Sequence, residues 1–448
     1  MPGISKKITG EITISTDTLA EIQKNIKNIV DFKEEIENAL KGRITELLEI
    51  ILGGAISLNV SDIHFEPKEK NAKIRVRIDG FLQDVLFLST DIYQRLVSRL
   101  KLLSGLKLNI EDRPQDGRFS ISLPEDPNAA IPKIYSIEIR TSTLPTEYGE
   151  TIVLRILNPK SLIDFDALGL REDLLKIFER ELKRPNGMII VTGPTGSGKT
   201  TTLYAFLKKI QKPETKIITI EDPIEYHLKG ISQTQVNPSK GYDFANGLRS
   251  IMRQDPDVVL VGEIRDLETA SIALQAALTG HLVFSTLHTN DAAGTIARLQ
   301  ALGEKPINIA PAINMAIAQR LVRKICKKCG KTEKASAETV KKIKNALKNL
   351  PKTTKTIKIP KIDASLTLPK AVGCKECNFT GYKGRVGIFE ALLIDDDLEK
   401  FILTSPSIAA LREKAIKKGM TTIYQDGIFK VLKGITTIEE VERVTGEE

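Results

Sequence analysis

A phosphate-binding loop between a strand-like run and a helix-like run constrains the fold of this chain more than any other feature. The loop is Gly193-Pro194-Thr195-Gly196-Ser197-Gly198-Lys199-Thr200, which satisfies the pattern G-x-x-x-x-G-K-[ST] in full. Met188–Val191 before it is a short apolar run typical of a buried parallel strand, and Thr200–Leu207 after it is typical of an amphipathic helix. This order of elements indicates an α/β fold with a parallel sheet.

The chemistry of the loop predicts that it binds a nucleoside triphosphate. Its glycines allow backbone N–H groups to turn toward the β- and γ-phosphates, and the N-terminus of the following helix adds positive potential. Lys199 is expected to reach the terminal phosphates and Thr200 to ligate Mg²⁺, with Thr201 beside it in the helix. The alternative is a chance Gly/Ser-rich turn, which the complete motif in this context disfavours.

Composition and charge limit the classes of function. A chain of 448 residues is long enough for two to four domains, and its net charge of +9, from 66 basic and 57 acidic residues, is small for that length. No apolar run reaches membrane-spanning length and the N-terminus is polar, so we expect a cytoplasmic protein without direct membrane insertion. The basic excess between Lys324 and Lys370 is interpreted as a solvated surface rather than a nucleic-acid footprint.

The cysteines of the chain form two C-x-x-C pairs, which are Cys326 with Cys329 and Cys374 with Cys377. In a cytoplasmic chain this pattern favours a tetrahedral Zn²⁺ site over disulfides, because thiolates two residues apart can chelate one metal from a single turn. Gly330 and Asn378 follow the pairs, and both residue types tolerate left-handed backbone. A redox pair and buried free thiols are the alternatives, although redox chemistry needs only one pair.

The N-terminal third predicts a helical segment followed by an α+β domain. Up to about Leu40 the apolar residues are spaced to form one stripe, made of Leu19, Ile22, Ile26 and Ile29-Val30. Helices are then expected over 44–58 and 92–106. Alternating patterns predict strands over 73–79, 81–88, 118–123, 134–141 and 151–157.

Past Leu168, strand and helix patterns alternate, which is the signature of a parallel sheet. Strands are expected over 187–192, 216–221, 258–262 and 282–286. Asp266–Gly280 is expected to be a helix with Gly280 as its C-cap. Four parallel strands that carry a phosphate loop predict a RecA-like core, and a short strand near 387–392 and further helices are expected after the cysteines.

Acids and histidines are expected at the edge of the sheet that carries the loop. Asp257–Glu263 is an apolar strand that ends in an acid, so Glu263 is the candidate to activate water or to bind on the metal side. Glu221 ends the strand before it, and His288 ends the strand after it, where it could sense the γ-phosphate. The alternative is that the acids are ordinary loop residues and that the histidine is structural.

Four longer motifs resemble those of the ATPases of type II secretion and type IV pilus assembly. They are Ser61–Pro67, Thr219–Tyr226, Arg253–Asp266 and Gly280–Asn290, which look like the opening motif of the domain before the core, the Asp box, the Walker B segment and the His box. Together with the cysteine pairs and Gly381–Arg385, the resemblance spans about residues 43 to 448. The cysteine pairs resemble secretion and pilus-extension motors, and they are not expected in retraction motors.

The resemblance implies a homo-hexameric ring that holds ATP and Mg²⁺ between the α+β domain and the RecA-like core. It implies that Arg140 and Arg155 meet the γ-phosphate, although by pattern alone each is an arginine on an alternating strand. Arg75 and Arg77 stay surface candidates. The implied partner is an inner-membrane platform protein. A large additional N-terminal domain that the family often carries has no counterpart in residues 1–42, which leaves the mode of docking open.

These patterns together predict an α/β protein with a RecA-like P-loop ATPase core, a preceding α+β domain and a C-terminal zinc-binding and helical segment. The expected boundaries are a helical segment at 1–42, the α+β domain at 43–158, a linker at 159–165, the core at 166–320 and the C-terminal region at 321–448.

The leading functional prediction is a cytoplasmic motor, peripherally associated with the membrane, that hydrolyses ATP to assemble pilin-like subunits in type II secretion or type IV pilus extension. One alternative is a RecA-like motor for DNA uptake or translocation, but nothing in the sequence indicates an aromatic stacking surface, so nucleic acid is not the expected partner. Another is a nucleotide-gated scaffold with little turnover, which the presence of Glu221, Glu263 and His288 disfavours.

Overall fold

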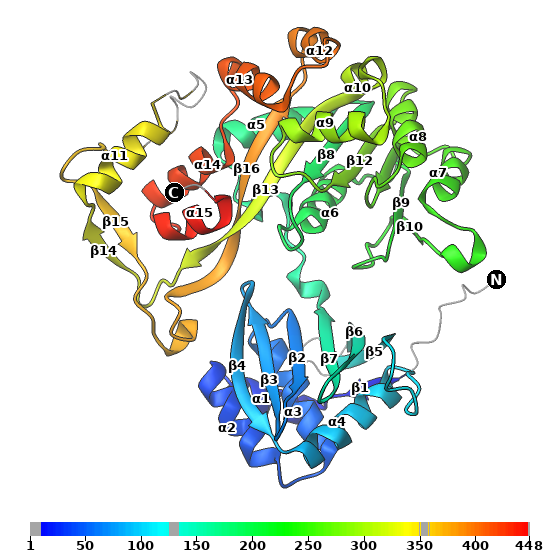
Figure 1. Cartoon of the computed structure of the whole chain (residues 1–448), viewed down its shortest axis with the longest axis vertical. Helices are drawn as coiled ribbons and strands as arrows, with labels where there is room; N and C mark the ends of the chain where they lie inside the picture. Colours follow the sequence, from blue (N-terminus) through cyan, green and yellow to red (C-terminus); the bar gives the residue numbers. More distant parts are fainter. Residues whose placement is uncertain (1–9, 125–133, 349, 351–356, 358, 447–448) are drawn as a thin grey trace. The chain divides into compact units, whose positions relative to one another are not determined.

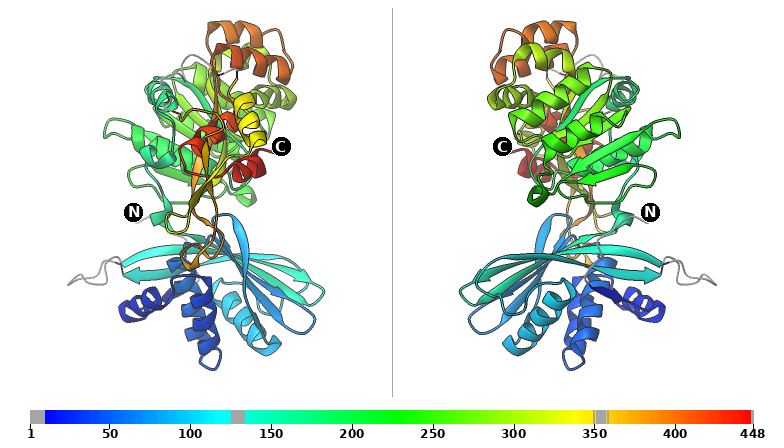
Figure 2. Two further views of the ribbon diagram at one scale, coloured as in Figure 1. Left: turned by 90° about the vertical axis from the view of Figure 1, so that its left-hand side faces the viewer. Right: turned by 90° about the vertical axis from the view of Figure 1, so that its right-hand side faces the viewer.

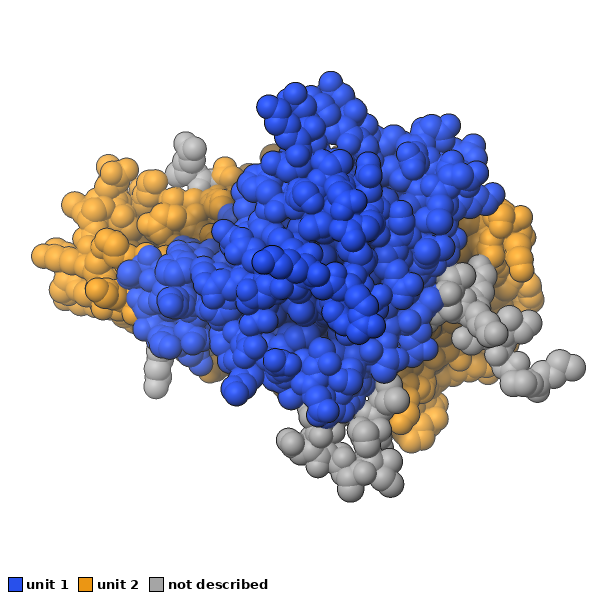
Figure 3. Space-filling view, turned by 90° about the horizontal axis from the view of Figure 1, so that it is seen from below, with its two compact units in different colours: residues 1–161, 326–329, 372–383 blue, residues 162–325, 330–371, 384–448 orange. Residues whose placement is uncertain are grey.

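The computed structural model describes residues 10–124, 134–348, 350, 357 and 359–446, which form two compact units (Figure 3). Unit 1 contains the described part of residues 1–161 together with 326–329 and 372–383. Unit 2 contains the described part of 162–325, 330–371 and 384–448. The two cysteine-bearing segments therefore belong to unit 1, although the chain on either side of each segment belongs to unit 2.

Unit 1 is built on a seven-stranded sheet in the order β1-β5-β6-β7-β2-β3-β4 (Figure 1). Its strands are β1 (Glu11–Thr13), β2 (Asp62–Pro67), β3 (Ala72–Ile78), β4 (Phe81–Leu88), β5 (Gln115–Pro124), β6 (Ile134–Thr146) and β7 (Gly149–Leu157). All neighbours pair antiparallel except β1, which runs parallel to β5. The alternation that predicted β3 is reproduced, since Ile74 and Val76 are buried while Arg75 and Arg77 are only half-buried.

Four helices cover one face of this sheet, as Figure 2 shows in blue and cyan. They are α1 (Thr16–Asn25), α2 (Ile29–Ala39), α3 (Ile44–Ser57) and α4 (Thr90–Leu103). The prediction of one continuous stripe at the N-terminus is wrong, because α1 ends at Asn25 and a second helix begins after Asn28. Asn28 caps α2 by accepting hydrogen bonds from the N–H groups of Val30 and Asp31. Val30, in the first turn of α2, is 39% exposed.

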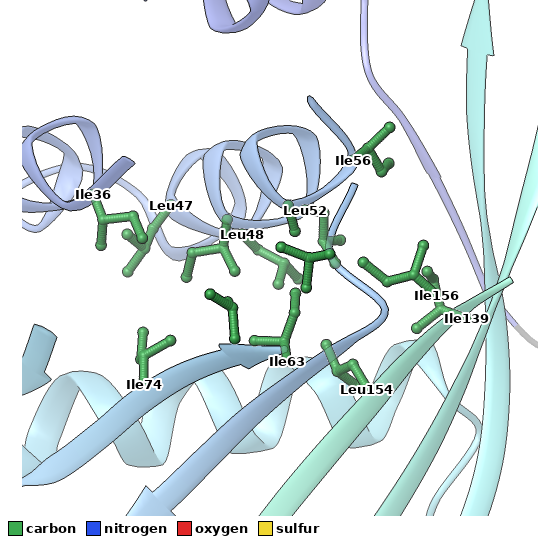
Figure 4. Packing of buried hydrophobic residues seen from close by; sticks show 14 of the residues in the cluster. Ile36, Leu47, Leu48, Leu52, Ile56, Ile63, Ile74, Ile139, Leu154 and Ile156 are labelled. Atoms are coloured by element: carbon green, nitrogen blue, oxygen red, sulfur yellow. The ribbon is translucent and has the colours of Figure 1, made fainter. Parts of the chain in front are cut away.

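The N-terminal helices share the hydrophobic core of the sheet, part of which is drawn in Figure 4. Gly53 and Gly54 of α3 allow this close packing. A Cβ at Gly53 would lie 2.7 Å from the side chain of Ile22 on α1, and one at Gly54 would lie 2.5 Å from Phe32 on α2. Helices α1 and α2 are therefore an integral layer of unit 1.

Unit 2 is built on a second seven-stranded sheet in the order β10-β9-β11-β12-β8-β13-β16. Its strands are β8 (Gly187–Thr192), β9 (Ile217–Glu221), β10 (Ser232–Gln235), β11 (Val258–Val261), β12 (Leu282–Leu287), β13 (Ile313–Ile325) and β16 (Tyr382–Leu393). The first six in this order are parallel, which confirms the predicted parallel sheet. The sequence analysis did not predict β10 or β13, and it made β16 too short, since this strand has 12 residues.

Helices pack on both faces of this sheet, because successive residues of β8 belong to different hydrophobic clusters. Met188 and Ile190 pack with α7 (Phe244–Met252), α8 (Leu267–Leu278), α9 (Ala293–Leu302) and α10 (Pro306–Ala312). Ile189 and Val191 pack with α5 (Glu172–Glu181) and α6 (Lys199–Ile210). The predicted helix over 266–280 is α8, which Asp266 caps, while Thr279 is its C-cap and Gly280 follows with a left-handed φ of 110°.

The C-terminal part of unit 2 is mainly helical. It contains the antiparallel pair β14 (Lys331–Lys334) and β15 (Thr367–Lys370), with α11 (Ala337–Ala346) between the two strands in the chain. The remaining helices are α12 (Asp396–Ile402), α13 (Ile408–Lys418), α14 (Ile423–Leu432) and α15 (Ile438–Thr445). Among the residues that the structure describes, no helix combines the length and the apolar character that crossing a membrane requires.

Candidate functional site

The phosphate loop joins the end of β8 to the start of α6, where the sequence placed it. Gly193, Gly196 and Gly198 have φ values of 149°, 79° and 88°, which side chains with a Cβ rarely adopt. A Cβ at Gly193 would lie 2.6 Å from the carbonyl oxygen of Gln319, and one at Gly198 would lie 2.9 Å from the side-chain nitrogen of Gln319. Glycine is therefore required both by the turns of the loop and by the approach of β13.

Two polar groups of the loop are available to an anion. The Nζ atom of Lys199 donates to the carbonyl oxygens of Gly193, at 2.8 Å, and of Pro194, at 3.2 Å. The buried hydroxyl of Ser197 has no hydrogen-bond partner in the described part of the chain. Burial lowers the pKa of Lys199 from its usual 10.5, and the positive charge of Arg320 contributes to the same shift while Glu263 opposes it. An incoming phosphate would supply an acceptor for both groups.

Glu263 lies beside Lys199 and His288, so the structure brings together three predicted site residues. Its Oε1 atom is 2.5 Å from the Arg265 guanidinium, and its Oε2 atom is 3.8 Å from Nε2 of His288. Burial lowers the pKa of His288 from its usual 6.5, and the charge of Lys199 adds to this effect. A neutral imidazole and a carboxylate therefore face the phosphate loop from neighbouring strand ends.

The turn that carries Glu263 is held by the backbone of the next strand. The hydroxyl of Thr286 donates to the Gly262 carbonyl oxygen at 2.7 Å, and the Ile264 N–H donates to the Thr286 carbonyl oxygen at 3.1 Å. A Cβ at Gly262 would lie 3.2 Å from the Ile220 carbonyl oxygen, so the strand end has little room for a larger residue. These contacts fix where the Glu263 side chain leaves the sheet.

Glu221 occupies a different environment from Glu263, although it also ends a strand. It is 4% exposed, and its carboxylate accepts hydrogen bonds from the Tyr204 hydroxyl, from Thr219 Oγ1 at 2.6 Å and from Gln233 Nε2 at 3.2 Å. Burial and the adjacent Glu221 charge raise the pKa of Tyr204, which keeps the phenol protonated as a donor. The Glu221 side chain thus ties the β9 edge to α6.

The segment after His288 is attached to the base of the phosphate loop. The Thr289 N–H donates to Thr192 Oγ1 at 2.8 Å, at the end of β8. The Arg320 guanidinium donates to the Asn290 carbonyl oxygen at 2.9 Å and lies 3.1 Å from where a Cβ of Gly193 would stand. Arg320 and Gln319 come from β13, which the sequence analysis did not identify. The apolar run 315–318 was the signal that could have placed them there.

In unit 1, Arg140 and Arg155 are direct neighbours across β6 and β7. They belong to one row of the sheet that runs through Arg118, Arg140, Arg155, Asp62 and Arg77. Asp62 binds Arg155 at 2.9 Å and Arg77 at 3.4 Å, and Glu138 binds Arg140 at 3.4 Å. Arg75, the other surface candidate of this sheet, pairs with Asp84. Arg140 and Arg155 therefore lie on the same face of one sheet, in a row that also contains Arg118 and Arg77.

The thiols of Cys326, Cys329, Cys374 and Cys377 all lie within 4.8 Å of one another. The Sγ atoms of Cys329 and Cys377 are 3.7 Å apart, and those of Cys374 and Cys377 are 3.8 Å apart. A tetrahedral Zn²⁺ with Zn–S bonds of about 2.3 Å separates its sulfurs by about 3.8 Å, so this donor set fits zinc. The spacing is far longer than a disulfide bond, and all four cysteines are free.

The turn after the second cysteine pair is attached to the N-terminal helices within unit 1. Asn378 has a left-handed φ of 51°, as its residue type suggested, and its side-chain oxygen accepts a hydrogen bond from the Ile29 N–H at 2.8 Å. Gly330 does not have a positive φ, so the expected left-handed turn after the first pair is absent. A zinc ion at the cysteines would stabilise this attachment.

Comparisons with known proteins agree with the geometry. The family described as "Type II/IV secretion system protein" matches residues 37–443. The chain is 42% identical to the type II secretion system ATPase E of Vibrio cholerae serotype O1, over 99% of this chain and 83% of that protein. It is 44% identical to the type IV pilus assembly ATPase PilB of Pseudomonas aeruginosa, over 89% of this chain and 66% of that protein.

A solved structure of similar fold is that of the pilus retraction motor PilT with bound ADP. It matches with a TM-score of 0.56 and 28% sequence identity, over 88% of this chain and 95% of the PilT chain. The similarity spans both units of the present structure, so the P-loop core and the sheet of unit 1 occur together in a related motor protein.

Proposed function

Since this chain belongs to the type II/IV secretion system family, which includes ATPases of type II secretion and of type IV pilus assembly, we propose that it hydrolyses ATP to drive the assembly of pilin-like subunits. The observation that carries the proposal is the group formed by Lys199, Glu263 and His288 at the phosphate loop. It combines a cation for phosphate with a carboxylate and a neutral imidazole at the ends of two parallel strands.

Each residue of this group has a defined role in phosphoryl transfer. The backbone N–H groups from Gly193 to Thr201, apart from Pro194, which has none, hold the phosphates together with the Lys199 ammonium, and the Thr200 hydroxyl ligates Mg²⁺. Glu263 accepts the proton of the attacking water, because it is the acid that leaves the sheet beside Lys199. His288 senses the γ-phosphate, and Glu221 positions α6 through Tyr204.

Arg140 and Arg155 contribute positive charge from unit 1. Phosphoryl transfer spreads negative charge over the equatorial oxygens, and an arginine brought in by a second domain stabilises that charge. Asp62 and Glu138, which bind these arginines, orient them in the absence of the nucleotide. ATP and Mg²⁺ are thus the proposed ligands of the loop, and Zn²⁺ is the proposed structural ligand of the cysteines.

The chain is proposed to work as a homo-hexamer in the cytoplasm, bound to an inner-membrane platform protein without inserting into the membrane itself. The support for this assembly is the family membership and the relatives' names, which connect them with type II secretion and type IV pilus assembly. DNA uptake is the competing cargo, and it is an outcome of the test.

The test is steady-state ATP hydrolysis by the full chain and by its Glu263→Gln variant, each alone, with the cytoplasmic part of a candidate platform protein, and with DNA. We expect the platform protein to raise turnover, DNA to have no effect, and the variant to bind ATP while losing about a hundredfold or more in turnover. The matched control is Glu413→Gln on α13, an exposed glutamate that pairs with Lys417.

Stimulation by DNA alone would replace this proposal with a nucleic-acid motor. ATP binding without turnover under every condition would favour a nucleotide-gated scaffold. Equal turnover by the wild-type chain and Glu263→Gln would remove Glu263 from the mechanism.

A further inference from the structure

A completely buried glutamate connects the segment after His288 with the C-terminal helices of unit 2. Glu390 is 0% exposed and lies within the buried run of β16. Its Oε1 atom accepts a hydrogen bond from the Ala292 N–H at 2.9 Å, and its Oε2 atom accepts one from the Ile423 N–H at 3.2 Å. Ala292 is the N-cap of α9, and Ile423 is the first residue of α14. One carboxylate therefore serves the positive ends of two helices.

The connection between β16 and α14 is reciprocal. Asp426 of α14, also 0% exposed, accepts a hydrogen bond from the Phe389 N–H at 2.8 Å. The same carboxylate binds Arg171 at 2.7 Å and Lys430 at 3.0 Å. Each element thus donates a backbone N–H to a buried carboxylate of the other. Because a small shift between them would break both hydrogen bonds, β16 and α14 must move together.

On the Ala292 side, Glu390 is connected to the nucleotide site through residues 289–291, each of which is held by a hydrogen bond. Thr289 is held by Thr192 at the base of the phosphate loop, and Asn290 is held by Arg320. Asp291 accepts a hydrogen bond from the Gly294 N–H at 2.7 Å and so caps the beginning of α9. Every step from His288 to Glu390 is therefore either a peptide bond or a hydrogen bond between ordered groups.

A purely stabilising role would not require a charge at this position. Burial raises the pKa of Glu390, which means that the carboxylate is costly there. The hydrogen bond from the Ala292 N–H and the charge of Arg412 on α13 offset only part of this cost. Apolar residues of similar volume usually stabilise a core as well as buried charges do. What the carboxylate adds is a simultaneous link to two helix N-termini.

We propose that Glu390 is a positioning residue that couples the γ-phosphate-sensing segment 288–292 to helix α14. A shift of His288 on γ-phosphate binding or release moves Ala292, and Glu390 transmits this displacement to the N-terminus of α14. This inference rests on the proposed ATPase function and adds to it the route by which the nucleotide state reaches the C-terminal helices.

The test is amide hydrogen exchange of residues 423–432 in the full chain, with Mg²⁺ and either ADP or the non-hydrolysable ATP analogue AMP-PNP. In the wild-type chain, we expect exchange of α14 to differ between the two nucleotides. In Glu390→Gln, where an amide nitrogen replaces one acceptor oxygen, this difference disappears, kcat falls about three- to thirtyfold, and the KM for ATP stays within about twofold of the wild-type value.

The matched control is Glu440→Gln. Glu440 is a buried glutamate of the same region, 1% exposed, and its carboxylate binds Arg323 and Arg443 rather than the segment after His288. This variant is expected to keep the nucleotide-dependent difference in α14. Loss of the difference in both variants would mean that any buried carboxylate of the region matters equally, which would overturn the specific role of Glu390.

The exchange measurement on the wild-type chain tests the proposed coupling even when Glu390→Gln does not fold. Exchange of α14 that is the same with ADP and AMP-PNP, in a chain that hydrolyses ATP, would overturn the inference and leave the proposed function intact. A chain that hydrolyses no ATP under any condition would instead overturn the function on which the inference rests.

Discussion

The two units have sheets of the same strand number but present their functional side chains in different ways. In unit 1, buried residues alternate with partly or fully exposed residues along β3 and along most of β7. In unit 2 every residue of β8, β9, β11 and β12 is buried, because helices cover both faces of the sheet. Unit 1 therefore presents charged groups on a sheet face, whereas in unit 2 the predicted site residues Glu263 and His288 lie just past the ends of β11 and β12.

This difference decides how precisely each site is built. Strand ends place one residue each, and hydrogen bonds from the neighbouring strand then fix it, as the Thr286 hydroxyl does for the turn at Gly262. A sheet face places a whole row at once, so Arg155 and Arg140 come with Arg118 and Arg77 in the same register. Carboxylates between the arginines then determine their orientation.

The largest effect is expected at the strand end of unit 2. Lys199→Ala removes the cation of the phosphate loop and should lower ATP turnover about a thousandfold, the loss typical of removing one preorganised charge. Turnover is measured with saturating Mg²⁺ and ATP. Lys208→Ala on the same helix, whose side chain pairs with Asp164, is the control and should retain activity. Normal activity of Lys199→Ala would contradict the assignment of the loop.

The sheet face of unit 1 offers a sharper comparison, because two arginines share one carboxylate. Arg155→Ala should lower kcat about a hundredfold when Arg155 stabilises the transition state. Arg77→Ala removes the other partner of Asp62 and should change kcat by less than about twofold. Equal losses in both variants would indicate that the row acts through its overall charge and not through one residue.

Each unit also contains a buried ion pair, so breaking the pair in one unit should lower the stability of that unit alone. Lys101 is 2.7 Å from Glu150 in unit 1, and both are buried. Lys101→Met leaves the Glu150 carboxylate unpaired and should lower the free energy of unfolding of unit 1 by about 3–5 kcal/mol. Thermal unfolding followed by hydrogen exchange should show an earlier transition in unit 1 alone. The exposed Lys107→Met is the control.

Metal removal tests the cysteine segments, which belong to unit 1 although they extend from strands of unit 2. Chelation should release one zinc ion per chain and destabilise the turn that binds Ile29. With zinc a thousandfold above its Kd, the loss is about 4 kcal/mol. Metal analysis and thermal unfolding with and without chelator measure both effects. A native mass spectrum without bound metal and with four free thiols would contradict the zinc assignment.

The smallest effect concerns the pH dependence at His288. The pKa of this imidazole is below 6.5 because burial and Lys199 disfavour its charged form, so it is neutral above that pH and protonates as the pH falls below it. We expect kcat/KM to be constant from pH 8 to 6.5 and then to decline about two- to tenfold. The inflection in the pH profile of kcat/KM should disappear in His288→Gln. If the inflection persists in this variant, a group other than His288 causes it.

The local patterns of the sequence predicted most strands of the two seven-stranded sheets. Alternation located β3, β4 and β7, and the order of apolar runs located β8, β9, β11 and β12. These predictions succeeded because period-two burial and short apolar runs are local properties. The same approach missed β13, since an apolar run of that kind has no local feature that separates a buried strand from a buried helix.

The residues of the candidate site also fall into those that local patterns predicted and those that they did not. Lys199 was found from the phosphate-loop motif, Glu263 and His288 were found because each follows a recognisable strand, and the tetracysteine was found from its spacing. Arg265 next to Glu263, and Arg320 on β13, were not assigned roles from sequence. Arg320 is far from the loop in the chain and reaches it only because β13 pairs with β8.

The sequence by itself determined the phosphate loop, the parallel sheet around it, the cysteine donors and the resemblance to secretion and pilus-assembly ATPases, because all of these depend on residue type and short spacing. Only the tertiary structure decided that Glu221 is sequestered by Tyr204 while Glu263 faces Lys199, and that Glu390 links two helices. These outcomes depend on strand order and on hydrogen bonds between distant segments, which no local pattern encodes.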